Sequence, residues 1–210
     1  FRASPVTAMC VNIMKKFSVL FLLIFITTIA SAYSPPIENS LSWLTANQNP
    51  DGSWGSDSDL AILNTSTVLD SLGYLNSIGP AYSNSVTWLN NQSSLSTDYL
   101  SRKVKSLYMS GADVSIDLSM LESNRKSDGA WGGDADSVSM IIDTALALRT
   151  LNAVNYPDLD TIGYAFSYLM DNQNINGGFG FYPGDESNVY MTAVVVQAFN
   201  SYNDTFDFQS

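Results

Sequence analysis

Two kinds of apolar segment alternate along the chain. In the first half of residues 159–202, Ile162, Phe166 and Leu169 recur at i, i+4 and i+7 between polar residues, which predicts an amphipathic helix with one wet side. Segments 139–148 and 190–199 are apolar nearly all round, which predicts helices buried on all sides. The alternation indicates two rings of helices, one facing solvent and one enclosed. A β-branched run leaves a buried strand as the alternative at 190–199, although the alanine-rich 139–148 favours a helix.

A short motif precedes three of these segments. Residues 44–55, 121–132 and 169–180 each carry a leucine, a polar residue, a glycine and an aromatic residue at one fixed spacing. The matching residues are Gln48, Arg125 and Gln173, then Gly52, Gly129 and Gly177, then Trp54, Trp131 and Phe179. Such a period indicates an internal repeat. Each unit then consists of a first helix, a Gly-aromatic turn, an acidic loop and a second helix.

The repeat divides residues 33–210 into four two-helix units, at about 38–77, 83–112, 116–154 and 159–202. The first unit predicts helices at about 40–47 and 60–75, separated by the turn chemistry of Pro-Asp-Gly. The second unit lacks the Gly-aromatic turn. Its helix, at about 98–109, carries the main basic cluster, which consists of Arg102, Lys103 and Lys105.

The N-terminal segment reads as a targeting sequence. Residues 1–13 begin without methionine, and we expect them to be upstream sequence or the end of a fragment. Residues 14–32 combine two lysines, an apolar run and Ala-Ser-Ala, which predicts a secretory signal peptide cleaved near Ala32. The run is shorter than the roughly 20 apolar residues that cross a bilayer. We therefore expect a secreted or cell-surface domain without a membrane span.

Composition excludes several functions for the chain from Tyr33 onward. This part has no histidine and no cysteine, so its stability must come from an apolar core and not from disulfides. Three of the nine basic residues precede it, which leaves six against 20 acidic residues, a net charge of −14. That charge repels phosphate backbones, so we expect no nucleic-acid partner. We also expect no cofactor.

The run from Gln48 to Trp54, Q-x-x-x-G-x-W, resembles the QW repeat of squalene–hopene and oxidosqualene cyclases. Their superfamily includes the β subunits of protein prenyltransferases. The resemblance implies an all-α fold, a partial α/α toroid built from about four helix hairpins. It also implies that the motif residues tie the end of an outer helix to its neighbour. The residues with this structural role are Gln48, Gly52, Trp54, Gly129, Trp131, Gln173, Gly177 and Phe179.

The catalytic residues of that superfamily are not matched. Cyclases protonate an alkene with a D-x-D-D motif that runs into Thr-Ala at the head of an inner helix. Alignment on Thr144 places Asp143 at the last acid but Ile142 at the proton donor. Prenyltransferases need zinc held by Asp, Cys and His, and the chain from Tyr33 lacks both Cys and His.

The missing groups favour a non-catalytic module that binds an apolar, isoprenoid-like ligand or a protein partner, as extracellular cobalamin carriers of this superfamily bind without catalysis. One alternative is a terpene cyclase or prenyltransferase fragment whose acid motif lies outside this chain. A helical toroid that acts on polysaccharide is a further alternative. Fold alone does not decide between them.

Acidic residues follow each Gly-aromatic turn and begin one second helix. They are Asp57, Asp59, Asp134, Asp136, Asp143, Asp185 and Glu186. If the three loops emerge at one end of the fold, these acids form an acidic rim that suits Ca²⁺ or a cationic ligand. The alternative is that they only complement the positive ends of the helix dipoles. No EF-hand spacing is present, so no metal ligand is assigned.

Overall fold

The computed structural model describes residues 33–208. The expected upstream segment (1–13) and signal peptide (14–32) lie outside the described residues. The chain divides into two compact parts, of which the first ends at Leu44 and the second spans Thr45–Ser210. Helix α2 (Pro35–Ala46) begins in the first part and has no buried residue. It starts earlier than residue 40, because two prolines occupy its first turn, where no backbone N–H donor is needed.

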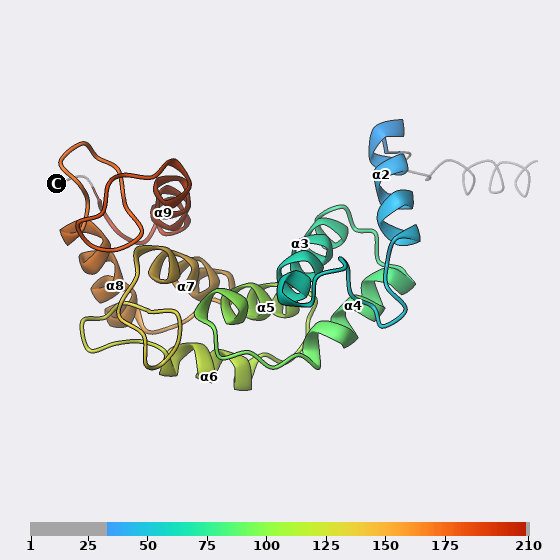
Figure 1. Ribbon diagram of the computed structural model, residues 1–210, viewed down its shortest axis with the longest axis horizontal. Coiled ribbons are helices and arrows are strands. Elements are labelled where there is room, and N and C mark those ends of the chain that lie inside the picture. Colours follow the sequence, from blue (N-terminus) through green and yellow to red (C-terminus); the bar gives the residue numbers. More distant parts are fainter. Residues whose placement is uncertain (1–32, 209–210) are drawn as a thin grey trace, which may run out of the picture. The chain divides into compact units, whose positions relative to one another are not determined.

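The second part consists of helices. They are the 3₁₀ turn η1 (Ser58–Leu60), α3 (Ala61–Tyr74), α4 (Pro80–Asn90), α5 (Thr97–Met109), α6 (Ser115–Ser123), α7 (Ile141–Ala153), α8 (Leu159–Asp171) and α9 (Val189–Ser201) (Figure 1). Residues 33–208 contain isolated β-bridges but no strand. The predicted all-α class is therefore confirmed, and the alternative of a strand at 190–199 is wrong. Within the same residues, no helix is long and apolar enough to cross a bilayer.

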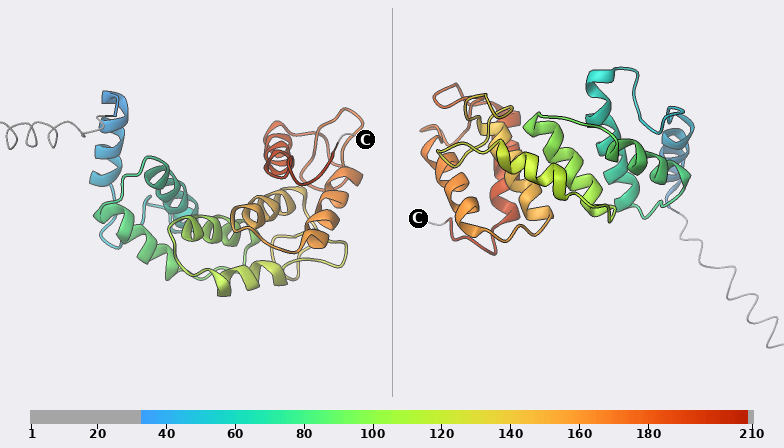
Figure 2. Two further views of the ribbon diagram at one scale, coloured as in Figure 1. Left: turned by 180° about the vertical axis from the view of Figure 1, so that it is seen from behind. Right: turned by 90° about the horizontal axis from the view of Figure 1, so that it is seen from below.

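Four helices of the second part pack in a row, in the order α3, α5, α7 and α9. Helix α4 packs against α3 and α5, α6 packs against α5, and α8 packs against α7 (Figures 1 and 2). Each row helix is the second helix of a predicted unit. The chain thus returns to the row after each loop, and this places α5 and α7 between neighbours on both sides.

Burial follows from that order. Helix α7 is buried along almost its whole length, as its all-round apolar pattern predicts. In α8, Ile162, Phe166 and Leu169 are buried and Tyr164 is exposed, which confirms the amphipathic pattern. Helix α9 corrects the prediction of burial on all sides.

In α9, Val189 and Val196 are 88% and 58% exposed. The pattern of α9 permits burial all round, but burial requires a neighbour on each side. Helix α7 has α5 and α9 as neighbours in the row. In the described chain, α9 has α7 on one side and Phe166 of α8 against Phe199 near its end. One face of α9 is therefore apolar and exposed.

Candidate functional site

The three Gly-aromatic turns have the same backbone geometry. In each, the aromatic residue donates its backbone N–H to a threonine hydroxyl in the helix that follows the loop. The pairs are Trp54 with Thr65 at 3.0 Å, Trp131 with Thr144 at 3.0 Å, and Phe179 with Thr192 at 2.9 Å. Each bond closes the loop onto the first turns of α3, α7 or α9. The threonine of the Thr-Ala type helix start therefore has a definite role in the turn.

A second set of bonds shapes each turn internally. The glycine N–H donates to the residue three positions earlier, and the glycine itself has positive φ, at Gly52 (97°), Gly129 (86°) and Gly177 (81°). The side chain before the glycine accepts the N–H two residues on, at Asp51, Asp128 and Asn176. Hydrogen bonds from Ser53 lower the pKa of Asp51. These are the local contacts of an Asx turn.

The polar residue that opens the motif differs between the turns. Gln48 Nε2 donates to the Gly52 carbonyl at 2.9 Å and to the Ala81 carbonyl in α4 at 2.8 Å. Gln173 Nε2 donates to the Gly177 carbonyl at 2.9 Å. Arg125, which replaces the glutamine in the second turn, forms a backbone bridge with Trp131. Only the glutamine of the first turn thus bonds to the next helix.

The aromatic residues are buried. Trp131 is 0% exposed, and its indole Nε1 donates to the Leu121 carbonyl in the last turn of α6 at 2.7 Å. The Leu121 carbonyl also accepts the N–H of Asn124, which caps α6, so the indole adds a second bond at this helix end. Phe179 is equally enclosed but has no side-chain donor. Trp131 and Phe179 thus belong to the apolar core, which supports a structural role for the motif.

The acidic residues after the turns make mainly local bonds. Asp57 accepts the N–H of Asp59 and caps η1. Asp134 accepts bonds from Asp136 and Ser137, and the Ser137 hydroxyl is the largest cause that lowers the pKa of Asp134. Asp185 accepts the N–H of Tyr182 within its own loop.

The acidic residues of the predicted rim are not arranged as metal ligands in the described residues. Asp57, Asp59, Asp134, Asp136, Asp185 and Glu186 are all exposed. Across residues 33–208, no group of three or more acidic, histidine or cysteine side chains is placed to hold a metal ion. Exposed carboxylates that close their own loops provide few convergent ligands.

Asp143 differs from the other acidic residues. It lies in the first turn of α7 and is 4% exposed. Burial, and then the charge of Asp98, raise the pKa of Asp143 to about 6. Its carboxyl group therefore stays mostly protonated at pH values up to about 6, because burial disfavours the charged form. Asp143 thus does not belong with the exposed acids.

Two adjoining pockets of the second part lie outside every sequence motif. The larger, of about 480 Å³, lies beside α3 and α5, and its apolar lining consists of Leu69, Tyr74, Ile78, Tyr82 and Met109. The smaller, of about 60 Å³, lies between α3, α5 and α7 and has a mostly polar lining. Asp70, Lys105 and Ser106 line both pockets.

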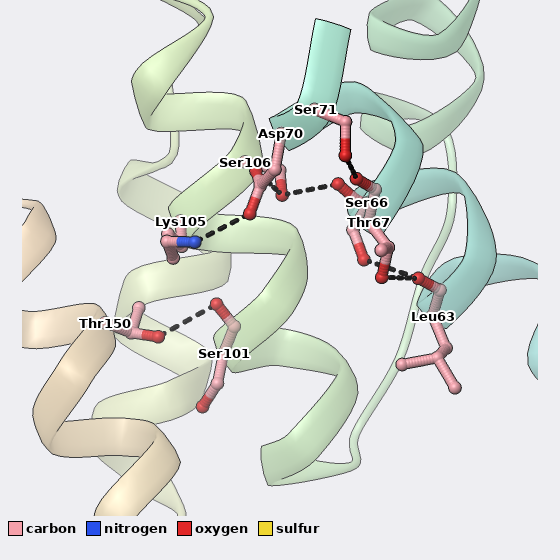
Figure 3. Close-up of polar contacts among 9 residues, drawn as sticks. All are labelled: Leu63, Ser66, Thr67, Asp70, Ser71, Ser101, Lys105, Ser106 and Thr150. Carbon is pink, nitrogen blue, oxygen red and sulfur yellow. Dashed lines mark hydrogen bonds and ion pairs between the residues drawn. The ribbon is translucent and has the colours of Figure 1, made fainter. Parts of the chain in front are cut away.

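The polar side chains that line both pockets are bonded to one another. Asp70 accepts from Lys105 Nζ at 2.6 Å and from the Ser106 hydroxyl at 2.6 Å, as Figure 3 shows. The basic cluster of α5 signals this region in the sequence, because Arg102 and Lys105 are three residues apart and share a helix face. The residues that α3 and α7 contribute to the pocket lining form no recognisable pattern in the sequence.

Comparison with known proteins does not assign the pockets. No protein-family model matches the chain, and no curated protein matches it. The function must therefore be inferred from the geometry of the pockets and the turns.

Proposed function

We propose that this chain is an exported, non-catalytic binding domain with the architecture of a partial α/α toroid, similar to the squalene cyclase and prenyltransferase superfamily. The support for the architecture is the pairing of helices, with α3, α5, α7 and α9 in a row. Three turns with equivalent hydrogen bonds add to it. A repeated two-helix unit that stacks on its neighbours accounts for both features.

The ligand is an uncharged apolar molecule of the isoprenoid class, and the larger pocket carries this proposal. Its volume of about 480 Å³ falls in the range of small-molecule sites, about 300–1,000 Å³. Tyr74, Ile78 and Met109 line it although each is exposed. Exposed apolar side chains around one hollow favour a ligand that covers them.

Farnesol, an uncharged isoprenoid alcohol, tests this function in calorimetric titration and thermal melting. We expect saturable binding and a rise in Tm, because a ligand that binds only the folded state stabilises it. Ile78→Glu, which places a charge at the pocket, should weaken binding at least tenfold. Ile175→Glu is the matched control, because Ile175 is fully exposed and lies outside the pocket. Equal affinity in the two variants, or no saturable binding, would refute the proposal.

The enzymatic alternative depends on Asp143. A buried carboxyl group with a pKa of about 6 has one property of a general acid, a pKa raised toward neutral pH. In a cyclase-like reaction Asp143 would have to protonate an alkene, although the motif alignment gives that position to Ile142. Incubation with squalene or a polyprenyl diphosphate, followed by mass spectrometry, tests this alternative. A cyclised or transferred product that is lost in Asp143→Asn would replace the binding function with catalysis.

A further inference from the structure

The smaller pocket concentrates positive charge in an acidic protein. The whole chain has nine Lys and Arg residues against 20 Asp and Glu. Three of the nine, Arg102, Lys105 and Arg149, line this one pocket of about 60 Å³. They come from two neighbouring helices of the row, α5 and α7. The net negative charge of the protein does not account for this local excess of positive charge.

Two of the three cations are neutralised by carboxylates. Arg102 Nε lies 2.6 Å from Asp98 Oδ1, and Lys105 Nζ lies 2.6 Å from Asp70 Oδ2. The Arg102 bond uses Nε, so the two terminal nitrogens of that guanidinium are not occupied by this partner. Lys105 is held at the boundary between the two pockets, where Figure 3 shows it beside Asp70.

Arg149 is the cation without a partner. Within residues 33–208 its guanidinium makes no hydrogen bond and no ion pair, although the side chain is half-buried. Burial, and then the like charge of Arg102, lower the pKa of Arg149, and this effect is only partly opposed by Tyr190 and Asp70. A guanidinium carries five N–H donors that suit planar oxyanions. Arg149 therefore has N–H donors without an acceptor, under the like charge of Arg102.

A buried hydroxyl provides an independent observation at the same pocket. Ser101 is 2% exposed and lines the pocket, and its Oγ has no hydrogen-bond partner in the described chain. The neighbouring hydroxyls are bonded, since Thr150 donates to the Ser101 carbonyl and Ser106 to Asp70 (Figure 3). Buried polar atoms without a partner are rare in native proteins, and a bound ligand is one reason for them.

We propose that this pocket binds a compact oxyanion, a carboxylate or phosphate group, between the Arg149 guanidinium and the Ser101 hydroxyl. The anion would accept charge-assisted hydrogen bonds from Arg149 and one from Ser101. A pocket of about 60 Å³ holds only a few water-sized groups, so it admits the anionic group and excludes a bulky substituent. The site does not depend on an apolar ligand in the larger pocket.

Calorimetric titration of the purified chain with sodium acetate and with sodium phosphate, at constant ionic strength in sodium chloride, tests the site. We expect saturable binding of at least one anion, and the stronger of the two identifies the carboxylate or the phosphate source. No saturable binding of either anion would overturn the proposal, since water would then fill the pocket. Farnesol carries no charge, so its binding reports the other pocket separately.

Three variants assign the binding groups. Arg149→Met removes the charge and keeps much of the side-chain volume, and we expect at least a tenfold loss of affinity. Arg125→Met is the matched control, because it removes the same charge from an exposed residue outside the pocket, and its affinity should be unchanged. Ser101→Ala should weaken binding about threefold to tenfold, as expected for one lost hydrogen bond. Unchanged affinity in Arg149→Met or in Ser101→Ala would overturn the assignment.

A further variant keeps the test valid if Arg149→Met fails to fold by circular dichroism. Arg149→Lys retains the positive charge but replaces the planar fork with a single ammonium group. We expect it to bind the anion several-fold more weakly than the original chain. Affinity equal to that of the original chain would mean that the guanidinium does not bind the anion, and the proposed site would be wrong.

Discussion

The second and third Gly-aromatic turns, residues 121–132 and 169–180, share the bonds of the glycine, of the preceding side chain and of the threonine, but they have different surroundings. A Cβ atom added at Gly129 would lie 2.7 Å from Tyr164 Cβ in α8. A Cβ atom added at Gly177 would meet no described atom within 4 Å. The first turn resembles the second, since a Cβ atom at Gly52 would lie 2.6 Å from the Asn84 carbonyl oxygen in α4.

The difference shows that the motif has two roles, to shape its own turn and to contact a later helix. The positive φ and the bond to threonine are formed within about one turn and loop of sequence. Close approach to a later helix requires that helix to be present, and α4 and α8 provide it for the first and second turns. The motif therefore specifies a local shape that can also serve as a docking surface for the next unit.

Substitution of the two glycines is expected to give the largest difference between the turns. Gly129→Ala combines the left-handed backbone penalty of about 1–2 kcal/mol with a steric overlap of about 1–3 kcal/mol. We expect it to lower the free energy of unfolding by about 3–4 kcal/mol. Gly177→Ala carries only the backbone penalty, about 1–2 kcal/mol. Urea unfolding measures both values, and equal losses would mean that contact with α8 has no energetic role.

The starts of α7 and α9 differ in a way that pH reveals. Asp143 occupies in α7 the place that Met191 occupies in α9, and both are buried. Because the pKa of Asp143 is raised to about 6, the folded state holds this proton more tightly than the unfolded state does. The contribution of Asp143 to stability is therefore greatest below about pH 4. It falls by as much as about 3 kcal/mol as the pH rises past 6.

Asp143→Asn should remove this pH dependence. Urea unfolding between pH 4 and 8 is expected to show that the variant gains stability relative to the original chain as the pH rises. Asp136→Asn, which changes an exposed loop aspartate, is the control and should leave the profile unaltered. A constant difference between Asp143→Asn and the original chain at every pH would contradict the assignment of a raised pKa to Asp143.

The threonines that fix the turns should rank in the same order as their burial. Thr144 is fully buried, accepts the Trp131 N–H and donates to the Met140 carbonyl at 2.8 Å. Thr144→Val leaves that N–H without a partner, which costs about 1–3 kcal/mol. Thr192 and its bond to the Phe179 N–H are only partly buried, so Thr192→Val should cost less, about 1 kcal/mol. Thr144→Ser, which restores the hydroxyl, should recover part of the loss.

Sequence periodicity predicts the helices well, because it depends on residues within one element. The segment 190–199 forms α9 despite its valine run, so its equivalence to the alanine-rich segment 139–148 is a better guide there than local β propensity. The exposed face of α9 was not predictable, since periodicity describes what a helix can bury and not which neighbours it has. The early start of α2 was missed for a local reason, the two prolines that are accepted in a first helical turn.

Apart from the basic cluster of α5, the pockets have no comparable signal in the sequence. The smaller pocket joins Asp70, Ser101 and Arg149, which come from three helices and are widely separated along the chain. No pattern in any one helix shows that they meet, and the unpaired state of Arg149 exists only in the assembled row. Asp143 was found by its place in a motif, but its pKa depends on burial and on Asp98 in another helix.

The smallest expected difference concerns the glutamines of the first and third turns. Gln48 is partly buried and joins its own turn to the Ala81 carbonyl at the start of α4, whereas the exposed Gln173 bonds only to Gly177. Gln48→Ala removes the two bonds that Nε2 donates and a longer one, of 3.5 Å, that Oε1 accepts from Asn84 in α4, so we expect a loss of about 1–2 kcal/mol. Gln173→Ala removes one exposed bond and should cost about 0.5 kcal/mol or less.

Proteolysis with a broad-specificity enzyme at low urea separates the two effects further. In Gln48→Ala the first turn loses its bond to the Ala81 carbonyl. The backbone of this turn should then open more often and be cleaved faster. Gln173→Ala should be cleaved at its own loop at a rate close to that of the original chain. If both glutamine variants lose equal stability, the bond to α4 contributes nothing, and docking on the next unit would depend on the close contacts at Gly52 and Gly129 alone.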